Sequence, residues 1–206
     1  MKESDVTKDP FNLIVTGVGG QGNVLASLLI GAVLVDQGYK ITIGETYGAS
    51  QRGGSVMSHL RISRTRQYGP LIPPGRADLV LALEPTEAAR VLAQFGNPDT
   101  VAVVNARPVY PVDVIAGDVE YPEMEELLKG IESLSRKSYF LAATEKAMEL
   151  GNPILANIIL IGAAAGAELL PVTVEGLEKA VAEYLSANKV SINTAAFLAG
   201  AQMTKS

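Results

Sequence analysis

The amino-acid sequence predicts an α/β protein with a Rossmann-like, doubly wound, mostly parallel sheet that is flanked by helices and followed by a helical C-terminal portion. Three observations lead to this prediction. Short apolar runs alternate with segments of helical periodicity, which is typical of parallel strands joined by helices. A glycine-rich turn separates the first apolar run from the first helical segment. The C-terminal part of the chain then holds helical segments without strands between them.

Strands are predicted where apolar runs end at turn residues. Residues 11–16 are apolar and lead into glycines, which is typical of a buried parallel strand. Residues 56–62 alternate between two faces, which favours an antiparallel strand or one near an edge. The other predicted strands are residues 40–45, 79–83, 101–104 and 138–141, with a short strand at 118–121 inside the irregular stretch 108–121.

Helices are predicted where apolar residues recur every three or four positions. Residues 22–37 have this spacing, and Gly38 ends the helix. Residues 154–167 are apolar on nearly all sides, which predicts a buried helix. Pro85 is typical of a first helical turn, so residues 85–95 are predicted as a helix. The remaining predicted helices are residues 122–130, 142–150, 174–185 and 193–203.

The composition limits the chemistry that this chain can carry out by itself. Its 206 residues include no cysteine and one histidine, His59. The chain therefore cannot form disulfides, use a thiolate nucleophile or ligate an iron–sulfur cluster. A single histidine excludes a multi-histidine metal site, and within a strand it is more often a packing residue than a catalytic one. A net charge of −5 without a run of Lys or Arg argues against nucleic acid as a partner.

The ends and the hydropathy of the chain suggest its organisation. Residues 1–10 are polar and end in proline, so we expect a flexible N-terminal tail. We expect residues 11–206 to form a single domain. The apolar stretches are shorter than a membrane span, and the first of them does not resemble a signal peptide. We therefore expect a cytoplasmic protein without membrane association.

The glycine-rich turn GVGGQG, at residues 17–22, matches G-x-G-x-x-G between a strand and a helix. We expect Gly17 to permit the tight turn, Gly19 to let an anion approach the backbone, and Gly22 to allow close packing of helix on strand. Two interpretations remain open, an anion or nucleotide site and a turn that serves packing alone. Glu45 lies roughly where a dinucleotide site needs an acidic residue. The candidate residues of this turn are Gly17, Gly19, Gly20, Gln21 and Gly22.

A second loop rich in glycine and polar residues follows the second predicted strand. In a parallel sheet it lies at the same carboxyl edge as the first turn, where ligands and partners bind. Arg52 supplies positive charge for an anion, beside the bare backbone of Gly53 and Gly54. The alternatives are a simple turn, or a salt bridge between Glu45 and Arg52 that only shapes the loop. The candidate residues of this region are Glu45, Gln51, Arg52, Gly53, Gly54 and Ser55.

Several segments, taken in order, carry a family resemblance. They are GVGGQG, GETYGASQRGGSVMSHLRIS, ADLVLALEPTEAARVL and VVNARPV, followed by GNPILANIILIGAAAG and VSINTAAFLAG. Together they resemble the gamma subunit or domain of 2-oxoacid:ferredoxin oxidoreductases, and most closely the beta subunit of the indolepyruvate ferredoxin oxidoreductases. The resemblance covers residues 11–200. A glycine motif alone is unspecific, whereas the ordered set with Gln-Arg-Gly-Gly-Ser is highly specific.

The resemblance implies a subunit of a complex that oxidatively decarboxylates a 2-oxoacid, with CoA as co-substrate and electrons passing to ferredoxin. Partner subunits would hold thiamine diphosphate and iron–sulfur clusters, and this chain would bind no cofactor stably. It would support assembly and the CoA side of the active site, without catalytic or metal-binding residues of its own. Independently of the resemblance, the second loop and the glycine-rich C-terminal helices offer more surface than a monomer needs, so we expect the isolated chain to self-associate through them.

Two other classes of function remain open. A stand-alone NAD(P)-dependent oxidoreductase would need a substrate domain and a proton-transfer residue, for which this chain offers little. A purely scaffolding module would use the glycine turn for packing alone.

Overall fold

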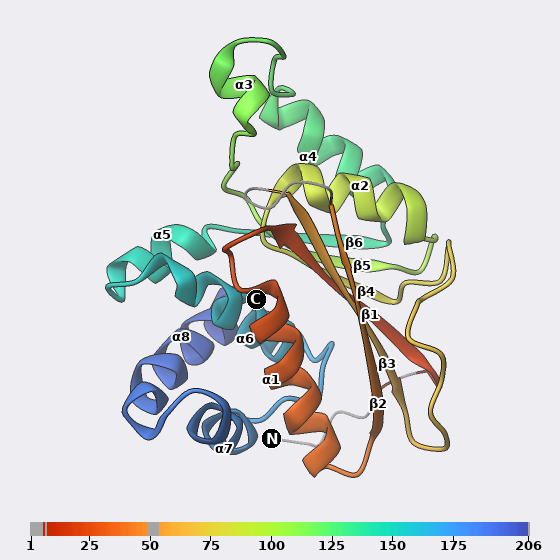
Figure 1. Ribbon diagram of the computed structural model, residues 1–206, viewed down its shortest axis with the longest axis vertical. Helices are drawn as coiled ribbons and strands as arrows, with labels where there is room; N and C mark the ends of the chain where they lie inside the picture. The colour runs from red at the N-terminus through yellow and green to blue at the C-terminus, as the bar shows by residue number, and fades with distance from the viewer. Residues whose placement is uncertain (1–5, 7, 49–53, 206) are drawn as a thin grey trace.

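The computed structural model describes residues 6, 8–48 and 54–205, with residues 112 and 113 described by their backbone only. Its centre is a six-stranded sheet in the order β2-β3-β1-β4-β5-β6 (Figure 1). The strands are β1 (Phe11–Val18), β2 (Lys40–Tyr47), β3 (Ser55–Ser63), β4 (Leu79–Ala82), β5 (Val101–Asn105) and β6 (Lys137–Leu141). The predicted Rossmann-like, mostly parallel sheet is confirmed.

β3 runs antiparallel to both of its neighbours, whereas β1, β4, β5 and β6 pair in parallel. The antiparallel prediction for residues 56–62 is therefore confirmed. Its physical reason is the connection 48–54, because a parallel crossover needs about a dozen residues or more. β2 consequently runs parallel to β1 but is separated from it by β3. The unit formed by β1, α1 and β2 is a split βαβ unit.

Helices cover both faces of the sheet (Figure 1). On one face, α2 and α4 pack over a core that includes Ile14 and Val80. On the other, α1, α6, α7 and α8 pack over a core that includes Leu13 and Leu81. Neighbouring residues of one strand thus enter two different cores, which explains the continuous apolar runs in the sequence.

Ten helical segments surround the sheet in the described ranges. They are α1 (Asn23–Asp36), α2 (Pro85–Phe95), α3 (Val112–Ala116), α4 (Met124–Ser133), α5 (Ala143–Glu149), η1 (Pro153–Leu155), α6 (Ala156–Gly166), α7 (Val174–Tyr184), η2 (Ala187–Lys189) and α8 (Val190–Met203). Even the apolar α6 has only 11 residues. No helix of the described ranges is long and apolar enough to cross a membrane.

Two predicted elements differ from the structure. The strand predicted at 118–121 is wrong, because these residues form no strand and follow the short helix α3. The segment projects away from the sheet, so no neighbouring strand can pair with it (Figure 1). The helix predicted at 154–167 is divided into η1 and α6. Asn152 caps η1 by accepting a hydrogen bond from Ile154 N at 3.1 Å.

The end of the predicted N-terminal tail contacts the rest of the protein. Lys8 Nζ lies 2.9 Å from Asp78 Oδ1. Asp9 Oδ2 accepts hydrogen bonds from Arg64 N at 3.3 Å and from Thr65 Oγ1 at 3.2 Å. These contacts tie residues 8 and 9 to the amino edge of the sheet. Residues 1–5 and 7 lie outside the described residues.

The glycines of the C-terminal helices serve packing between α6 and α8. A Cβ atom on Gly162 would lie 2.0 Å from Phe197 O, and one on Gly200 would lie 1.9 Å from Ile159 O. The two backbones therefore approach more closely than any side chain would allow. These glycines are therefore not themselves part of a free surface, and self-association through the C-terminal helices stays a prediction.

We expect Gly200→Ala to destabilise the protein by roughly 1–3 kcal/mol, because the new methyl group would overlap a backbone carbonyl that cannot move freely. Gly130→Ala in α4 is the matched control, since nothing lies within 4 Å of its Cβ position. It should stabilise the protein by about 0.5–1 kcal/mol. Urea unfolding of both variants measures these changes, and effects of the same sign would contradict the packing role of Gly200.

Candidate functional site

The glycine-rich turn joins β1 to α1 at the carboxyl edge of the sheet. Gly20 and Gly22 have φ angles of 96° and 82°, which favour glycine. Gly22 is the N-cap of α1 and provides no side-chain cap. The first N–H groups of α1, including that of Val24, therefore lack a partner from the helix or its cap. As predicted, the turn lies at a helix N-terminus with donors left for a ligand or water.

Two glycines of the turn have different contacts from those predicted. Gly19 N donates a hydrogen bond to Gly54 O at 2.9 Å, so this N–H is not available to an anion. A Cβ atom on Gly22 would lie 2.3 Å from Asn157 Nδ2, and this amide donates to Gly22 O at 3.1 Å. Gly22 therefore permits close contact with α6 rather than close packing of α1 on β1.

The side chain of Gln21 closes the space between the ends of β1 and β4. Its Oε1 accepts a hydrogen bond from Val18 N at 2.8 Å, and its Nε2 donates to Leu83 O at 3.0 Å. Gly17 lies in β1, where a Cβ atom would be 2.5 Å from Gln21 Oε1. The predicted role of Gly17 in a tight turn is therefore wrong, because Gly17 instead makes room for this side chain.

This closed space is the topological switch point of the sheet. The chain leaves β1 toward α1 on one face and leaves β4 toward α2 on the other (Figure 1). In open α/β sheets such a point usually leaves a crevice for a ligand. Here the Gln21 amide fills it and forms hydrogen bonds on both sides. A ligand at this point would have to displace these two hydrogen bonds.

A hollow of about 600 Å³ lies beside the turn, between α1, η1 and the ends of β2 and β3. It combines bare backbone with apolar and aromatic side chains. Tyr47, at the end of β2, is 63% exposed. Asn23 Oδ1 is buried and has no hydrogen-bond partner among the described residues. The lining residues that matter here are Gly19, Gly20, Gly22, Asn23, Val24, Tyr47, Gly54, Ser55 and Ile154.

The structure brings the described ends of the second loop to this hollow. Gly48 N donates to Ser55 O at 2.7 Å, and Gly54 O accepts the hydrogen bond from Gly19 N. The prediction that both loops share one edge is confirmed for these ends. Gln51, Arg52 and Gly53 lie outside the described residues, so their predicted binding role stays a prediction.

Glu45 is not placed as a dinucleotide site requires. It does not line the hollow, and its carboxylate accepts a hydrogen bond from Tyr47 OH. β3 separates β2 from β1, so the two strands that carry Glu45 and the turn lie about 10 Å apart, or two strand spacings. Together with the closed switch point, this geometry argues against the NAD(P) alternative.

Ser55 belongs to a polar cluster around the buried carboxylate of Glu87, which the sequence did not predict. Glu87 Oε2, on α2, accepts hydrogen bonds from Ser55 Oγ at 2.7 Å and Thr16 Oγ1 at 3.3 Å. Arg90 donates to the same oxygen through Nη2 at 2.6 Å and Nε at 3.2 Å. We call these four residues the Glu87 cluster. Its charge-assisted bonds tie β1, β3 and α2 together, so Ser55 has a structural role.

A second buried carboxylate, Glu84, caps α2. Its Oε2 accepts hydrogen bonds from Glu87 N at 2.9 Å and Thr86 Oγ1 at 2.5 Å. Its Oε1 accepts from Tyr121 OH at 2.5 Å, and Val109 N lies 3.5 Å away. Negative charge is favourable at a helix N-terminus. The position of Glu84 directly before a proline at the start of a helix was a signal for this cap.

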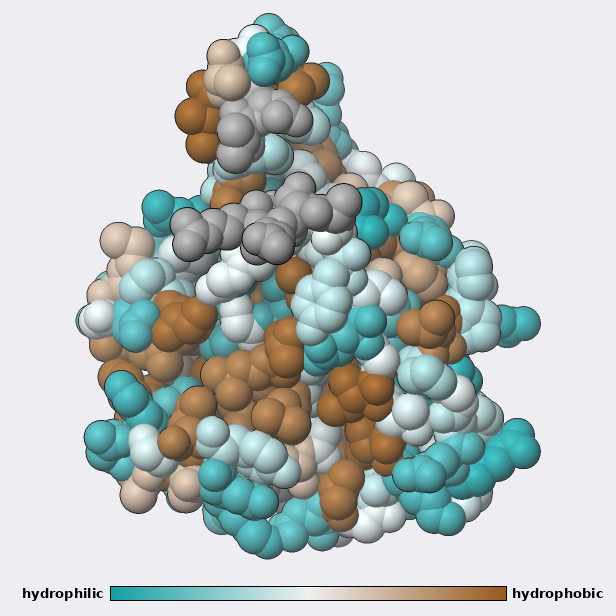
Figure 2. All heavy atoms as spheres, viewed as in Figure 1, coloured by the Kyte–Doolittle hydropathy of each residue, from teal (hydrophilic) through white to brown (hydrophobic). Residues whose placement is uncertain are grey.

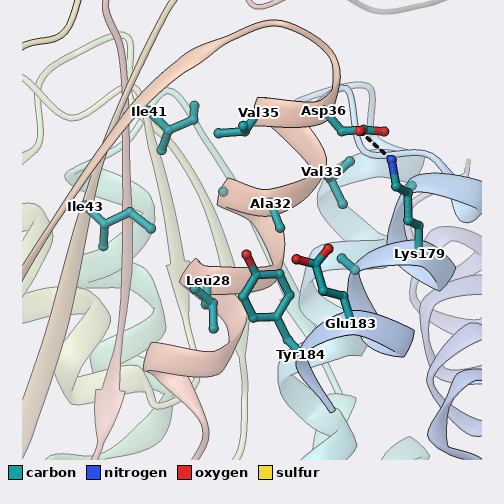
Figure 3. Close-up of a pocket in the computed structure, with 13 residues that line it drawn as sticks. Leu28, Ala32, Val33, Val35, Asp36, Ile41, Ile43, Lys179, Glu183 and Tyr184 are labelled. Atoms are coloured by element: carbon teal, nitrogen blue, oxygen red, sulfur yellow. Dashed lines mark hydrogen bonds and ion pairs between the residues drawn. The ribbon is translucent and has the colours of Figure 1, made fainter. Parts of the chain in front are cut away.

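A second hollow of about 500 Å³ lies between α1, β2 and α7 (Figure 3). Leu28 and Ile43 line it, with Tyr184 projecting from α7. At its edge, Lys179 Nζ lies 2.5 Å from Asp36 Oδ1. The cation is thus paired, and no uncapped helix end reaches this hollow. The hollow beside the turn is therefore the better candidate for an anionic ligand.

His59 is a packing residue, as the sequence predicted. It is 1% exposed, its ring lies edge-on to Phe95 with centroids 5.3 Å apart, and its Nδ1 accepts from Ile72 N at 3.4 Å. Burial, with a smaller effect of Arg61, lowers the pKa of His59 and favours the neutral ring. Within the described part of the chain, no group of three His, Cys, Asp or Glu side chains could hold a metal ion.

These features define a Rossmann-like α/β module whose buried polar side chains hold the fold together, while an uncapped helix end borders an open hollow. A family model described as pyruvate ferredoxin/flavodoxin oxidoreductase matches residues 12–203. The chain belongs to this family, which confirms the resemblance identified in its sequence.

A curated relative agrees with this assignment, and solved structures share the fold. Indolepyruvate oxidoreductase subunit IorB of Archaeoglobus fulgidus is 36% identical over 190 residues, which are 92% of this chain and 93% of that protein. The gamma subunit of a keto/oxoacid ferredoxin oxidoreductase from Geobacter sulfurreducens has the same fold, with a TM-score of 0.67, 23% identity and coverage of 94% and 98% of the two chains. A 2-oxoglutarate:ferredoxin oxidoreductase from Magnetococcus marinus matches with a TM-score of 0.72 and 20% identity, over 96% of this chain but 31% of that chain.

We expect Tyr121 to make the protein less stable at alkaline pH. Burial, and then the hydrogen bond to Glu84, raise the pKa of Tyr121 above its ordinary value of 10.0. The folded state therefore holds the phenolic proton more tightly than the unfolded state. This contribution to stability is complete below about pH 10 and is lost as the pH rises further.

Urea unfolding at neutral and alkaline pH measures this effect. The wild type should lose more stability above about pH 10 than Tyr121→Phe, which has no phenolic proton to lose. Tyr184→Phe is the control, because Tyr184 is 44% exposed, and it should behave as the wild type does. Equal alkaline losses in the wild type and Tyr121→Phe would contradict the expectation.

Proposed function

We propose that this chain is a non-catalytic subunit of a 2-oxoacid:ferredoxin oxidoreductase complex, with indolepyruvate as the candidate substrate. The observation that carries the proposal is the similarity to an indolepyruvate oxidoreductase subunit, at 36% identity over nearly the full length of both chains. In such a complex a 2-oxoacid is oxidatively decarboxylated, its acyl group passes to CoA, and its electrons pass to ferredoxin.

The composition of the chain supports a division of labour with its partners. Without cysteine it cannot ligate an iron–sulfur cluster. Its most buried carboxylates, Glu84 and Glu87, are both engaged in holding secondary structure. We assign thiamine diphosphate and the clusters to partner subunits, and to this chain the completion of the assembly.

We further propose that the hollow beside the turn binds part of CoA. The first N–H groups of α1 suit its phosphates, because the helix dipole favours negative charge at this end. The apolar sides formed by Val24 and Ile154, with the exposed Tyr47 ring, suit its pantetheine arm and adenine base. One solved protein with the same fold is described with coenzyme A bound. Arg52 is expected to add positive charge, as predicted from the sequence.

We expect the isolated chain to show no reduction of a viologen dye with indolepyruvate and CoA. Activity should appear when the thiamine-binding subunit from the same organism is added, because that subunit would carry the reacting cofactor. Dye reduction assayed with each subunit alone and with both together measures this. Activity from this chain alone, or no gain from mixing two folded subunits, would contradict the proposed function.

We expect Val24→Glu to raise the apparent KM for CoA in the assembled complex about tenfold relative to Val24→Gln. Val24 is 39% exposed in the first turn of α1, so a carboxylate there would repel phosphates. A carboxylate in the first turn also interacts favourably with the helix dipole, so α1 should remain folded. Gln has nearly the same size as Glu, so a comparison of the two variants isolates the effect of the charge. Equal CoA dependence of the two variants would place the phosphates elsewhere.

A further inference from the structure

Residues 108–123, which we call the arm, project from the carboxyl edge of the protein between β5 and α4. α3 lies within the arm, far from the sheet (Figure 1). The arm carries apolar side chains that are unusually open to solvent. Ile115 is 74% exposed, Val119 is 55% exposed and Tyr110 is 52% exposed. A cluster of this kind on a projection is typical of a protein interface.

The charge of the arm has one sign. Its sixteen residues include four acidic residues and neither lysine nor arginine. Asp118, Glu120 and Glu123 are exposed beside the apolar side chains. Figure 2 shows hydrophobic and hydrophilic atoms together on this projection. A complementary surface would therefore be apolar at its centre and basic at its rim.

The base of the arm is fixed to the body of the protein. Glu84 accepts the hydrogen bond from Tyr121 OH at the end of the arm, and Val109 N at its start lies 3.5 Å from the same carboxylate oxygen. The rings of Tyr110 and Tyr121 contact each other edge-on, with centroids 5.0 Å apart. Such anchoring lowers the entropy that the arm loses when it binds.

We propose that the arm docks into an apolar socket rimmed by Lys and Arg on the thiamine-binding subunit, with Ile115 and Val119 inserted. This inference rests on the proposed function. The arm rises from the same edge of the sheet that carries the candidate CoA hollow. In the Magnetococcus marinus protein the matching region is 31% of the chain, so a module with this fold continues there into a much larger polypeptide. A second copy of this chain is the poorer occupant, since the chain carries a net charge of −5 and would repel an acidic arm.

The first test removes the apolar side chains. Ile115→Ser with Val119→Ser should weaken binding to the purified thiamine-binding subunit on the order of 10- to 30-fold, as for truncated interface anchors. Val35→Ser on α1 is the matched control, because Val35 is 57% exposed and Val119 is 55% exposed. The control should bind as the wild type does. Calorimetric titration gives the affinities, and unchanged thermal melting of each variant shows that it is folded.

The second test removes charge without changing shape. Asp118→Asn with Glu120→Gln should slow association at low ionic strength and match the wild type at high ionic strength, because screening removes the attraction to a basic rim. Stopped-flow or surface-based association rates measure this. Equal salt dependence of variant and wild type would overturn the charge complementarity.

The outcomes separate this inference from the function on which it rests. If the wild type binds the thiamine-binding subunit and the serine variant binds equally well, the arm is not the docking element and the proposed function stands. If the wild type does not bind that subunit, both are overturned. If light scattering of the isolated chain shows an oligomer that only the arm variant loses, while partner binding is unchanged, the arm serves self-association and the proposal is wrong.

Discussion

The arrangement of the carboxyl edge depends on one side chain, the amide of Gln21, which joins the ends of β1 and β4 through Val18 N and Leu83 O. It fills the space in which many α/β proteins bind a nucleotide. The uncapped end of α1 remains, but it opens onto the neighbouring hollow instead. A sequence motif shared with dinucleotide-binding proteins thus produces a different binding geometry, because a glutamine within the motif occupies the usual position of the ligand.

The two buried carboxylates form hydrogen-bond networks that stabilise the fold and take no part in a proposed reaction. Glu84 and Glu87 lie one helical turn apart at the start of α2, and each accepts several hydrogen bonds. Glu84 joins α2 to the arm, and Glu87 joins α2 to β1 and β3. A buried carboxylate without such donors would be strongly unfavourable, so these networks account for the burial of both. Hydrogen bonds to these two carboxylates stabilise the carboxyl edge of the sheet, whereas apolar packing stabilises its interior.

The sequence predicted the features that depend on local patterns. Strands and helices follow from periodicity, and the glycine turn was expected at the start of a helix. The antiparallel direction of β3 was already suggested by the alternation in residues 56–62. What failed depended on contacts that local periodicity does not encode, and several of these contacts join residues far apart in the chain. Gln21 and Leu83 are 62 positions apart, and Asn157 and Gly22 are 135 positions apart. The sequence could not reveal that the Gly17 and Gly22 positions make room for these particular side chains. The prediction of a strand at 118–121 was wrong for a related reason, because no neighbouring strand lies where it could pair with these residues.

The insertion of β3 between β1 and β2 has a consequence for the order in which the chain can assemble during synthesis. β1 leaves the ribosome before the other strands of this sheet, and both of its neighbours lie later in the chain, with Leu13 opposite Leu60 in β3 and opposite Leu79 in β4. The edge of β1 toward β3 can pair once residues 55–63 have emerged, whereas its edge toward β4 stays unpaired until residues 79–82 have emerged. Domains generally fold as units during translation, and unpaired strand edges favour aggregation. The centre of this sheet is therefore completed later than the position of β1 in the sequence would suggest.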